Sequence, residues 1–392
     1  MDRFVYADNA ATTKPSQKVI NTLTKVLEED YGNPSSLYEI GSSAKNIIDE
    51  ARKKVAFALN AEEKEIYFTS GGSEADNWAI KGAALRALKK GKNEIISTVF
   101  EHHAVLNTLK ALEKQGFKII LLPVYENGII HLEDLKAAFT DKTALVSIMY
   151  AKNEIGTIQP VKEIGAICKE KGVLFHTDAV QAVGNIEIDV KEQNIDMLSL
   201  SAHKFHGPKG VGALYINKSV FIENLIDGGA QERHRRAGTE NTASIAAFGT
   251  AIEEACSNIK EKQKKIKEIR DRVINGALKI ERSRLNGDIE NRLCGNVNVC
   301  FEGIEGESLI LMLDMKGICA SSGSACTSGS LDPSHVLLSI GLPHEIAHGS
   351  LRLSFSDNNT IEDADYILEV LPPIVKRLRE MSPLWDRIKR GE

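Results

Sequence analysis

The chain has 392 residues, with 26% charged residues, 42% hydrophobic residues and a formal net charge of −5. This is an ordinary globular composition in which acids and bases are interspersed, so a nucleic-acid partner, which usually needs a concentrated basic face, is not expected. No apolar run approaches the ~20 residues of a membrane helix, and the first residues lack the basic-then-apolar plan of a signal peptide.

From about residue 64 the sequence alternates between short β-rich runs and longer segments of helical period. Apolar residues at 75, 79, 83, 84 and 88, for example, predict a helix over 75–88. Seven runs predict strands: 65–69, 94–99, 118–124, 144–150, 173–177, 196–200 and 211–216. Such alternation is typical of α/β proteins and predicts a mostly parallel seven-stranded sheet covered on both faces.

The segment from 259 to about 279 is rich in charge, and its simplest interpretation is a solvated helix that leads out of the large domain. Beyond it we expect strands over 295–301 and 350–355 and an amphipathic helix from Ile361. The first dozen residues could belong to either domain, and we assign them to the smaller one. The sequence therefore predicts a large α/β domain over 13–258 and a smaller α+β domain over 1–12 and 259–392.

The smaller domain carries a loop, about 320–333, that is made almost entirely of Ser, Thr, Gly and Ala around Cys326. Small residues bury little apolar surface, so we expect this loop to be mobile. Cys326 is poorly placed there for packing and well placed to react at one point and deliver something at another. The other cysteines, at 168, 256, 294, 300 and 319, lie in helix- or strand-like stretches and are expected to be packing residues. No disulfide framework is present in their spacing, and reduced thiols in a cytoplasmic protein are the simplest interpretation.

Open α/β sheets bind ligands at the carboxyl ends of their strands, so the polar residues at those points are candidates for a site. After the first strand, Gly72 and Ser73 open a helix whose N-terminus could seat an anion, although a plain helix cap would look the same. His102 follows the second strand and could stack on a bound ring, although a lone histidine is more often structural. Asn153, in the turn after the fourth strand, could bind a ligand through its amide, although the Asn-Glu-Ile-Gly turn explains this residue nearly as well.

The next two strands end in charged residues. Asp178 would be costly at the end of a buried strand unless it met several hydrogen-bond donors or a cation, and that cation could be a protonated ring nitrogen or a neighbouring arginine. Lys204, in the run Ser201-Ala202-His203-Lys204, could bind an aldehyde if shielded from water, although most lysines are surface residues. Together the five positions supply an anion seat, a stacking ring, an acid for a ring nitrogen and a lysine for an aldehyde, which is what pyridoxal 5'-phosphate requires.

With these motifs the chain resembles the cysteine desulfurases of the NifS/IscS branch, which are class-V-aminotransferase-like members of the fold-type I pyridoxal-phosphate enzymes. The resemblance runs nearly end to end, from residues 6–13 through 32–36 to 382–385. Its most specific motifs are 201–204 with 207–210, and 321–328. Residues 235–241, Arg-Arg-Ala-Gly-Thr-Glu-Asn, resemble the nitrogen-fixation-type NifS group more than the housekeeping members.

The resemblance implies a role for each candidate. Catalysis would fall to Cys326, Lys204 and His102, with Lys204 also holding the aldehyde and carrying protons. The cofactor-binding set would be Gly72, Ser73, His102, Asn153, Asp178, Gln181, Ser201, His203, Lys204 and Thr239, with Thr239 reaching the phosphate of the neighbouring subunit of a homodimer. The substrate-binding set would be Asn153, Arg352 and Asn33.

The implied activity is conversion of L-cysteine to L-alanine, with the sulfur kept as a persulfide on Cys326 and passed to an acceptor. The expected acceptor is an iron–sulfur scaffold protein of the NifU/IscU type. Sulfur donation for tRNA thiolation or thio-cofactor synthesis, or a related pyridoxal-phosphate lyase or aminotransferase, are the alternatives. No metal site is expected in the isolated protein, because no acid or thiol completes a ligand set beside His203 and His206, although Cys326 could be a transient iron–sulfur ligand shared with a scaffold.

Overall fold

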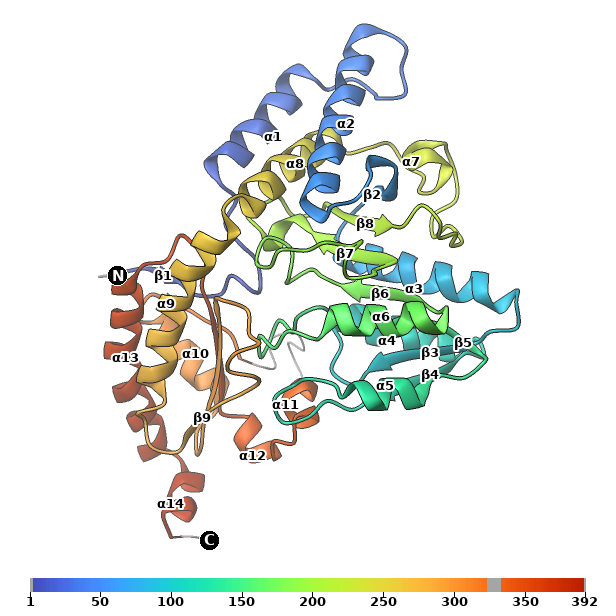
Figure 1. The fold of residues 1–392 in the computed structure, drawn as a ribbon. Helices are drawn as coiled ribbons and strands as arrows, with labels where there is room; N and C mark the ends of the chain where they lie inside the picture. The colour runs from blue at the N-terminus through green and yellow to red at the C-terminus, as the bar shows by residue number, and fades with distance from the viewer. Residues whose placement is uncertain (1–2, 323–332, 391–392) are drawn as a thin grey trace.

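The computed structural model describes residues 3–322 and 333–390, and a seven-stranded sheet forms the middle of its larger unit (Figure 1). The order across the sheet is β2-β8-β7-β6-β5-β3-β4. The strands are β2 (Ile66–Thr69), β3 (Glu94–Thr98), β4 (Lys118–Leu122), β5 (Thr143–Ser147), β6 (Leu174–Asp178), β7 (Met197–Ser201) and β8 (Gly212–Ile216). All pairs are parallel except those of β8, which runs antiparallel to β2 and β7. The predicted α/β fold with a mostly parallel seven-stranded sheet is confirmed.

Neighbouring residues of each central strand face opposite helical layers. Ile95 and Ile96 of β3 illustrate this, because Ile95 packs in the layer of α3 (Gly72–Leu88) and α4 (His103–Glu113), and Ile96 packs in the layer on the other face. That second layer contains α2 (Glu39–Leu59), α6 (Val161–Lys171) and α8 (Thr242–Cys256). A strand buried on both faces favours apolar residues at successive positions, as Ile95 and Ile96 show.

A second apolar core belongs to a smaller α+β unit. Its three-stranded antiparallel sheet has the order β12-β10-β9, with β9 (Ser283–Leu285), β10 (Asn296–Phe301) and β12 (Ser350–Ser354). β1 (Val5–Tyr6) pairs with β11 (Ile318–Cys319), and Val5 and Ala7 lie in the same core. The N-terminal segment thus packs with the C-terminal third of the chain, while the exact boundaries at 12 and 258 stay a prediction.

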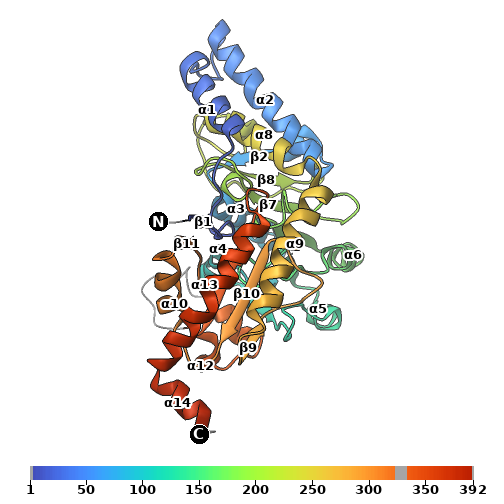
Figure 2. The ribbon, with the colours of Figure 1, turned by 90° about the vertical axis from the view of Figure 1, so that its left-hand side faces the viewer.

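The charged helix α9 (Ile259–Ala277) is more than the solvated connector that its composition indicates. It lies beside α13 (Ile361–Glu380) in both ribbon views (Figures 1 and 2). Ile266, Ile269 and Val273 recur at helical spacing and are buried in the second core. Charge on the other positions conceals this apolar stripe in the overall composition.

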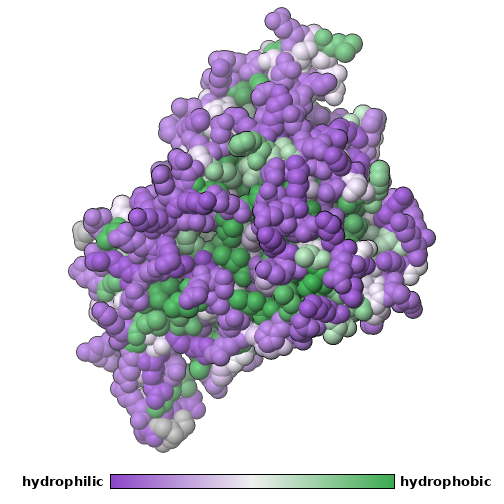
Figure 3. Space-filling view, viewed as in Figure 1, coloured by the Kyte–Doolittle hydropathy of each residue, from purple (hydrophilic) through white to green (hydrophobic). Residues whose placement is uncertain are grey.

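The remaining helices lie at the edges of the two units. They are α1 (Gln17–Glu29), α5 (Leu132–Ala138), α7 (Gln231–His234), α10 (Gly306–Asp314), α11 (His335–Ser339), α12 (His344–Ala347) and α14 (Pro383–Arg390). The face in Figure 3 is mostly hydrophilic, with hydrophobic residues gathered across its middle. Among the described residues, no helix combines the length and the apolarity needed to cross a membrane.

The cysteines outside the 321–328 motif are packed. Cys168, Cys294 and Cys300 are buried, and Cys256 and Cys319 are half-buried. Burial raises the pKa of the Cys256, Cys294 and Cys300 thiols to about 11. These three thiols are therefore protonated and unreactive near neutral pH, as expected of packing residues.

Candidate active site

A cavity of about 480 Å³ lies at the carboxyl ends of β6 and β7, against the smaller unit. Ten of the predicted site residues line it: Gly72, Ser73, His102, Asn153, Asp178, Gln181, Ser201, His203, Lys204 and Arg352. The rest of the wall comes from Asp8, Ala10, Ala11, Asp76, Met149, Val180 and Ser321. A cavity of this size suits a small cofactor together with an amino acid.

One end of the cavity is a helix N-terminus that approaches the sheet closely. α3 begins at Gly72, directly after the turn that follows β2. A Cβ atom on Gly72 would lie 2.6 Å from Val180 Cγ2, so only glycine fits without displacing the wall. Gly71 adopts φ +154°, which glycine reaches at low cost. Free N–H groups of the first helical turn and the Ser73 hydroxyl form a seat for an anion such as a phosphate.

His102 caps the next helix. Its Nδ1 accepts a hydrogen bond from the main-chain N–H of Ala104 at 3.1 Å, so the neutral ring carries its proton on Nε2. Burial, followed by the charges of Lys152 and Lys204, lowers the His102 pKa to about 4. His102 is therefore uncharged near neutral pH and presents a flat ring with one donor to the cavity.

Asp178 is the last residue of β6. One of its carboxylate oxygens accepts a hydrogen bond from the Val180 N–H at 3.0 Å. Burial raises its pKa, and only the charges of Lys152 and Lys204 and that hydrogen bond oppose the shift. The acid is thus short of compensating charge, and a protonated ring nitrogen would supply it.

Lys204 lies in the single turn of 3₁₀ helix that follows β7, Ala202–Lys204. Its Nζ donates hydrogen bonds to the main-chain oxygens of Ala10 and Ala11, at 2.7 and 2.8 Å. Gln181 Nε2 donates to the same Ala10 oxygen at 2.9 Å. The N-terminal segment therefore holds the lysine at the wall of the cavity.

The opposite wall offers groups for a carboxylate. Arg352, on β12, has a side chain that is 3% exposed, and its Nε has no hydrogen-bond partner among the described residues. Asn153 is buried, and its Oδ1 is likewise without a partner in that part of the chain. A guanidinium and an amide on one cavity wall are a suitable pair for binding a carboxylate.

The described chain does not bring every predicted residue to the cavity. Thr239 is exposed, and Asn33 is exposed in the connection between α1 and α2, where its Oδ1 accepts the N–H of Ser35 at 2.9 Å. Neither residue is in the cavity wall. Cys326 lies outside the described residues, which end at Ser322 and resume at Pro333. The roles of these three residues stay predictions.

Three polar residues of the wall were missed by the sequence analysis. Asp8 contacts both Ser321 and Arg352 across more than 300 residues of sequence, so no local pattern indicates this cluster. Asp76 lies in α3, four residues after Gly72, so its spacing from the glycine turn was a usable signal. It is buried, its pKa is raised by burial and then by the charge of Asp178, and its Oδ1 lies 3.6 Å from His176 Nε2.

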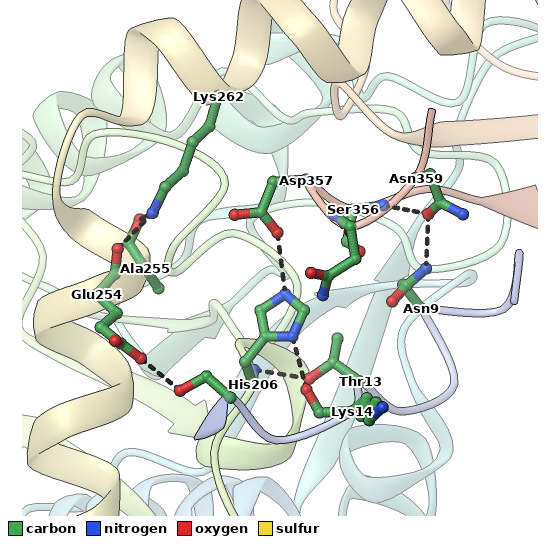
Figure 4. Close-up of polar contacts among 12 residues, drawn as sticks. Asn9, Thr13, Lys14, His206, Glu254, Ala255, Lys262, Ser356, Asp357 and Asn359 are labelled. Atoms are coloured by element: carbon green, nitrogen blue, oxygen red, sulfur yellow. Dashed lines mark hydrogen bonds and ion pairs between the residues drawn. The ribbon is translucent and has the colours of Figure 1, made fainter. Parts of the chain in front are cut away.

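A second cavity, of about 80 Å³, lies behind Lys204 where the N-terminal segment, α8 and α9 meet (Figure 4). His206 lies between Lys14 and Asp357 there, with Nδ1 2.8 Å from the Lys14 oxygen and Nε2 3.6 Å from Asp357 Oδ1. Because the Lys14 carbonyl can only accept, Nδ1 carries the proton. His206 has φ +64° and links both units two residues after Lys204.

These features fit a pyridoxal-phosphate-type cofactor. The glycine-lined helix N-terminus suits its phosphate, and Asp178, whose charge is only partly compensated, suits its ring nitrogen. The unpartnered Asn153 and Arg352 atoms remain for the carboxylate of an amino acid.

The chain resembles known proteins over nearly its whole length. Residues 5–367 match the family described as Aminotransferase class-V. The protein named Cysteine desulfurase IscS from Clostridium botulinum (strain Hall) is 59% identical over 389 residues, with 98% of each chain covered. A solved NifS-like protein has a TM-score of 0.90 at 39% identity, covering 96% of this chain and all of that one. The structure of SspA in complex with cysteine has a TM-score of 0.81 at 36% identity, covering 90% of this chain and 99% of that one.

Proposed function

The chain belongs to the aminotransferase class-V family and, within it, to the cysteine desulfurases, and we propose that it converts L-cysteine to L-alanine with pyridoxal 5'-phosphate in the cavity described above. The predicted resemblance is confirmed by this membership, and the family is pyridoxal-phosphate-dependent. Whether the chain is nearest to the nitrogen-fixation-type group stays a prediction, because its relatives bear both names.

One observation carries the proposal. A single cavity combines Lys204, Asp178 and His102 with a glycine-lined helix N-terminus and with the unpartnered Nε of Arg352. The first four features suit the cofactor, and the last suits an α-carboxylate. Few other ligand pairs would use all of them at once.

In this proposal, Gly72, Ser73, Ser201 and His203 hold the phosphate, Asp178 pairs with the ring nitrogen, Gln181 contacts the ring oxygen and Lys204 binds the aldehyde. The bound cofactor would withdraw electrons from the α-carbon of the amino acid. Burial lowers the His203 pKa to about 4, so this ring serves as a neutral hydrogen-bonding group rather than as a cation.

The side chains of the cavity then orient the substrate and move its protons. Arg352 and Asn153 would bind the carboxylate, and Lys204 Nζ would accept the α-proton of the substrate. The neutral His102 ring would offer a flat face to the cofactor and could donate from Nε2, since its Nδ1 already accepts a hydrogen bond from the Ala104 N–H. We also propose that Asn33 contributes to substrate binding.

Sulfur transfer requires a nucleophile, and we assign it to Cys326 from the family motif at 321–328. Its thiolate attacks the sulfur of the substrate, so that an S–S bond forms as the Cβ–S bond breaks. The electron pair of the broken bond stays on carbon, which takes up a proton and leaves as alanine. Cys326 retains the sulfur as a persulfide for an acceptor, which we propose is an iron–sulfur scaffold protein of the NifU/IscU type, and Cys326 could transiently share an iron–sulfur ligand role with it.

We further propose that the enzyme acts as a homodimer in the cytoplasm. The exposed position of Thr239 supports a homodimer, because this residue lies outside the cavity wall of its own chain. In a dimer with shared sites it would reach the phosphate of the second cavity.

The experiment supplies cysteine labelled on sulfur and follows alanine release together with the mass of the peptide that contains Cys326. We expect stoichiometric alanine and a persulfide on that peptide, and no alanine above background for Cys326→Ala. Cys319→Ala is the matched control, because its half-buried thiol lies outside the reaction in this proposal. Alanine release from Cys326→Ala at the parental rate would disprove the persulfide step. Adding a scaffold protein or a tRNA-thiolation carrier then identifies which one takes the label.

A further inference from the structure

The carboxylate of Asp8 joins two segments of the cavity wall. One oxygen, Oδ1, accepts a hydrogen bond from Arg352 Nη2 at 2.8 Å. The other, Oδ2, accepts from Ser321 Oγ at 2.8 Å. Both oxygens of one acid are therefore used by residues that line the proposed substrate side of the cavity.

The main chain fixes this arrangement from several directions. β1 and β11 are parallel neighbours with Tyr6 opposite Cys319, so Asp8 and Ser321 each lie two residues beyond a paired position. Arg352 and Ser321 exchange two main-chain hydrogen bonds, at 2.6 and 3.1 Å. Main-chain hydrogen bonds among three separate parts of the sequence thus hold Asp8, Ser321 and Arg352 next to one another.

Arg352 is a buried cation that needs this partner. Its side chain is 3% exposed and that of Asp8 is 17% exposed, and this is the ion pair of Arg352 among the described residues. Removing one member of such a pair leaves the other charge without compensation in a poorly solvated place. The guanidinium would then be free to turn towards any other acceptor.

The pairing leaves part of the guanidinium unused. Arg352 Nε is buried and has no hydrogen-bond partner in the described chain, while Nη2 is engaged by Asp8. An unmade hydrogen bond at a buried donor is costly, and a bound carboxylate would remove that cost. The orientation that Asp8 imposes therefore decides where a substrate carboxylate can bind.

We propose that Asp8 is a positioning residue that holds the Arg352 guanidinium for the α-carboxylate of the substrate and is itself held by Ser321. The proposal rests on the role of Arg352 in the proposed function. It predicts an effect on ligands that carry a carboxylate and none on ligands that lack one.

The test is a binding titration of the cofactor-loaded protein with L-alanine and with ethylamine, which is alanine without its carboxylate, followed by the visible absorbance of the bound cofactor. For Asp8→Ala we expect L-alanine to bind at least about tenfold more weakly, with ethylamine changed less than about twofold. Asp8→Asn keeps an oxygen acceptor for Arg352 and should lie between the parent and Asp8→Ala. The KM for cysteine should rise with the same order of variants, while kcat changes by less than about threefold.

Arg3→Met is the matched control, because Arg3 pairs with Asp363 at 2.7 Å near the start of the same N-terminal segment, outside the cavity wall. Its two affinities should equal those of the parent. Unchanged or tighter L-alanine binding by Asp8→Ala would overturn the proposal, since Asp8 would then be a bystander or a competitor for Arg352.

A second measurement needs no bound cofactor, so it also applies to variants that bind the cofactor poorly. It tests this proposal independently of the proposed function. The free energies of unfolding of the cofactor-free parent, Asp8→Asn, Arg352→Gln and the double variant form a cycle. Non-additive values support the pairing, and additive values overturn it. Absence of alanine formation by the parent protein would instead contradict the proposed function, whatever the cycle shows.

Discussion

Lys204 Nζ donates a hydrogen bond to the main-chain oxygen of Ala10 at 2.7 Å, across 194 residues of sequence. The contact fixes the position of the lysine amine, which follows β7, against the N-terminal segment. That segment packs with the smaller unit. The two units therefore meet at the amine that is proposed to bind the cofactor.

Replacing this amine tests the centre of the site. Lys204→Ala should lose the visible absorbance of the bound cofactor after dialysis. The rate of alanine formation should fall by about 10²–10⁴-fold, because a positioned proton carrier is removed. Absorbance spectra and alanine assays measure the two effects. Lys209→Ala, at an exposed lysine of the following turn, should resemble the parent. Parental absorbance and turnover in Lys204→Ala would show that another residue holds the cofactor.

The sequence predicted those parts of the site that depend on local patterns. Asp178 and Ser201 are the last residues of β6 and β7, and these short β-rich segments can be found within a few positions of the sequence. The helix α9 was interpreted too simply, because its numerous charges outweigh the buried stripe formed by Ile266, Ile269 and Val273. Scoring the apolar residues against helical spacing would have revealed that stripe, whereas the overall composition did not.

Other parts of the site depend on tertiary packing and leave no local signal. Asp8 contacts Arg352 across 344 residues, and the pairing of β1 with β11 that places Asp8 beside Ser321 involves only two residues per strand. Strands so short have no measurable period. Thr239 shows a further limit, because the role that we propose for it involves a second subunit and so depends on contacts between two chains.

His176 predicts a loss of stability in acid. Its ring lies between the hydroxyls of Ser147 and Ser199, each at 2.9 Å, and burial lowers its pKa from 6.5 to about 3. The unfolded chain binds a proton below pH 6.5 and the folded chain does not, so the free energy of unfolding falls as the pH drops from about 6.5 towards 3. The full effect is roughly 3–5 kcal/mol.

Denaturant unfolding of the cofactor-free protein across that range measures this slope. The variant His176→Asn should show a shallower fall than the parent, whatever its absolute stability. His234→Asn, at an exposed position whose φ of +62° asparagine tolerates, should leave the slope unchanged. Equal slopes for His176→Asn and the parent would contradict the assignment.

Glu101 predicts the opposite dependence. Burial raises its pKa to about 8, even though Oε1 accepts hydrogen bonds from the Thr98 hydroxyl at 2.6 Å and the Met149 N–H at 3.1 Å. The folded protein retains a proton that the unfolded chain releases above pH 4.5, so stability is full below that pH and falls as the pH rises towards 8. Glu101→Gln, which imitates the protonated acid, should remove most of this fall, roughly 3–5 kcal/mol in full.

The same unfolding experiment between pH 5 and 8 measures the Glu101 effect. Glu113→Gln serves as its control, because this acid lies exposed in α4. A parental slope in Glu101→Gln would mean that the carboxylate is ionised in the folded protein.

The buried pair of Arg52 and Glu232 fixes the segment that leads to Thr239. The Glu232 carboxylate accepts hydrogen bonds from Arg52 Nη1 and Nη2 at 2.8 and 2.9 Å, and from the Phe68 N–H of β2 at 3.0 Å. Glu232→Gln should lower the free energy of unfolding by about 3–5 kcal/mol, since it leaves a buried guanidinium without its counter-charge.

If the 231–241 segment contributes to a dimer, the same change should also promote dissociation into monomers, which sedimentation at several concentrations measures. Asp365→Asn, in the exposed pair with Arg272, should change stability by less than about 1 kcal/mol and leave the dimer intact. An unaltered stability of Glu232→Gln would show that the pair is not what holds this segment against the sheet.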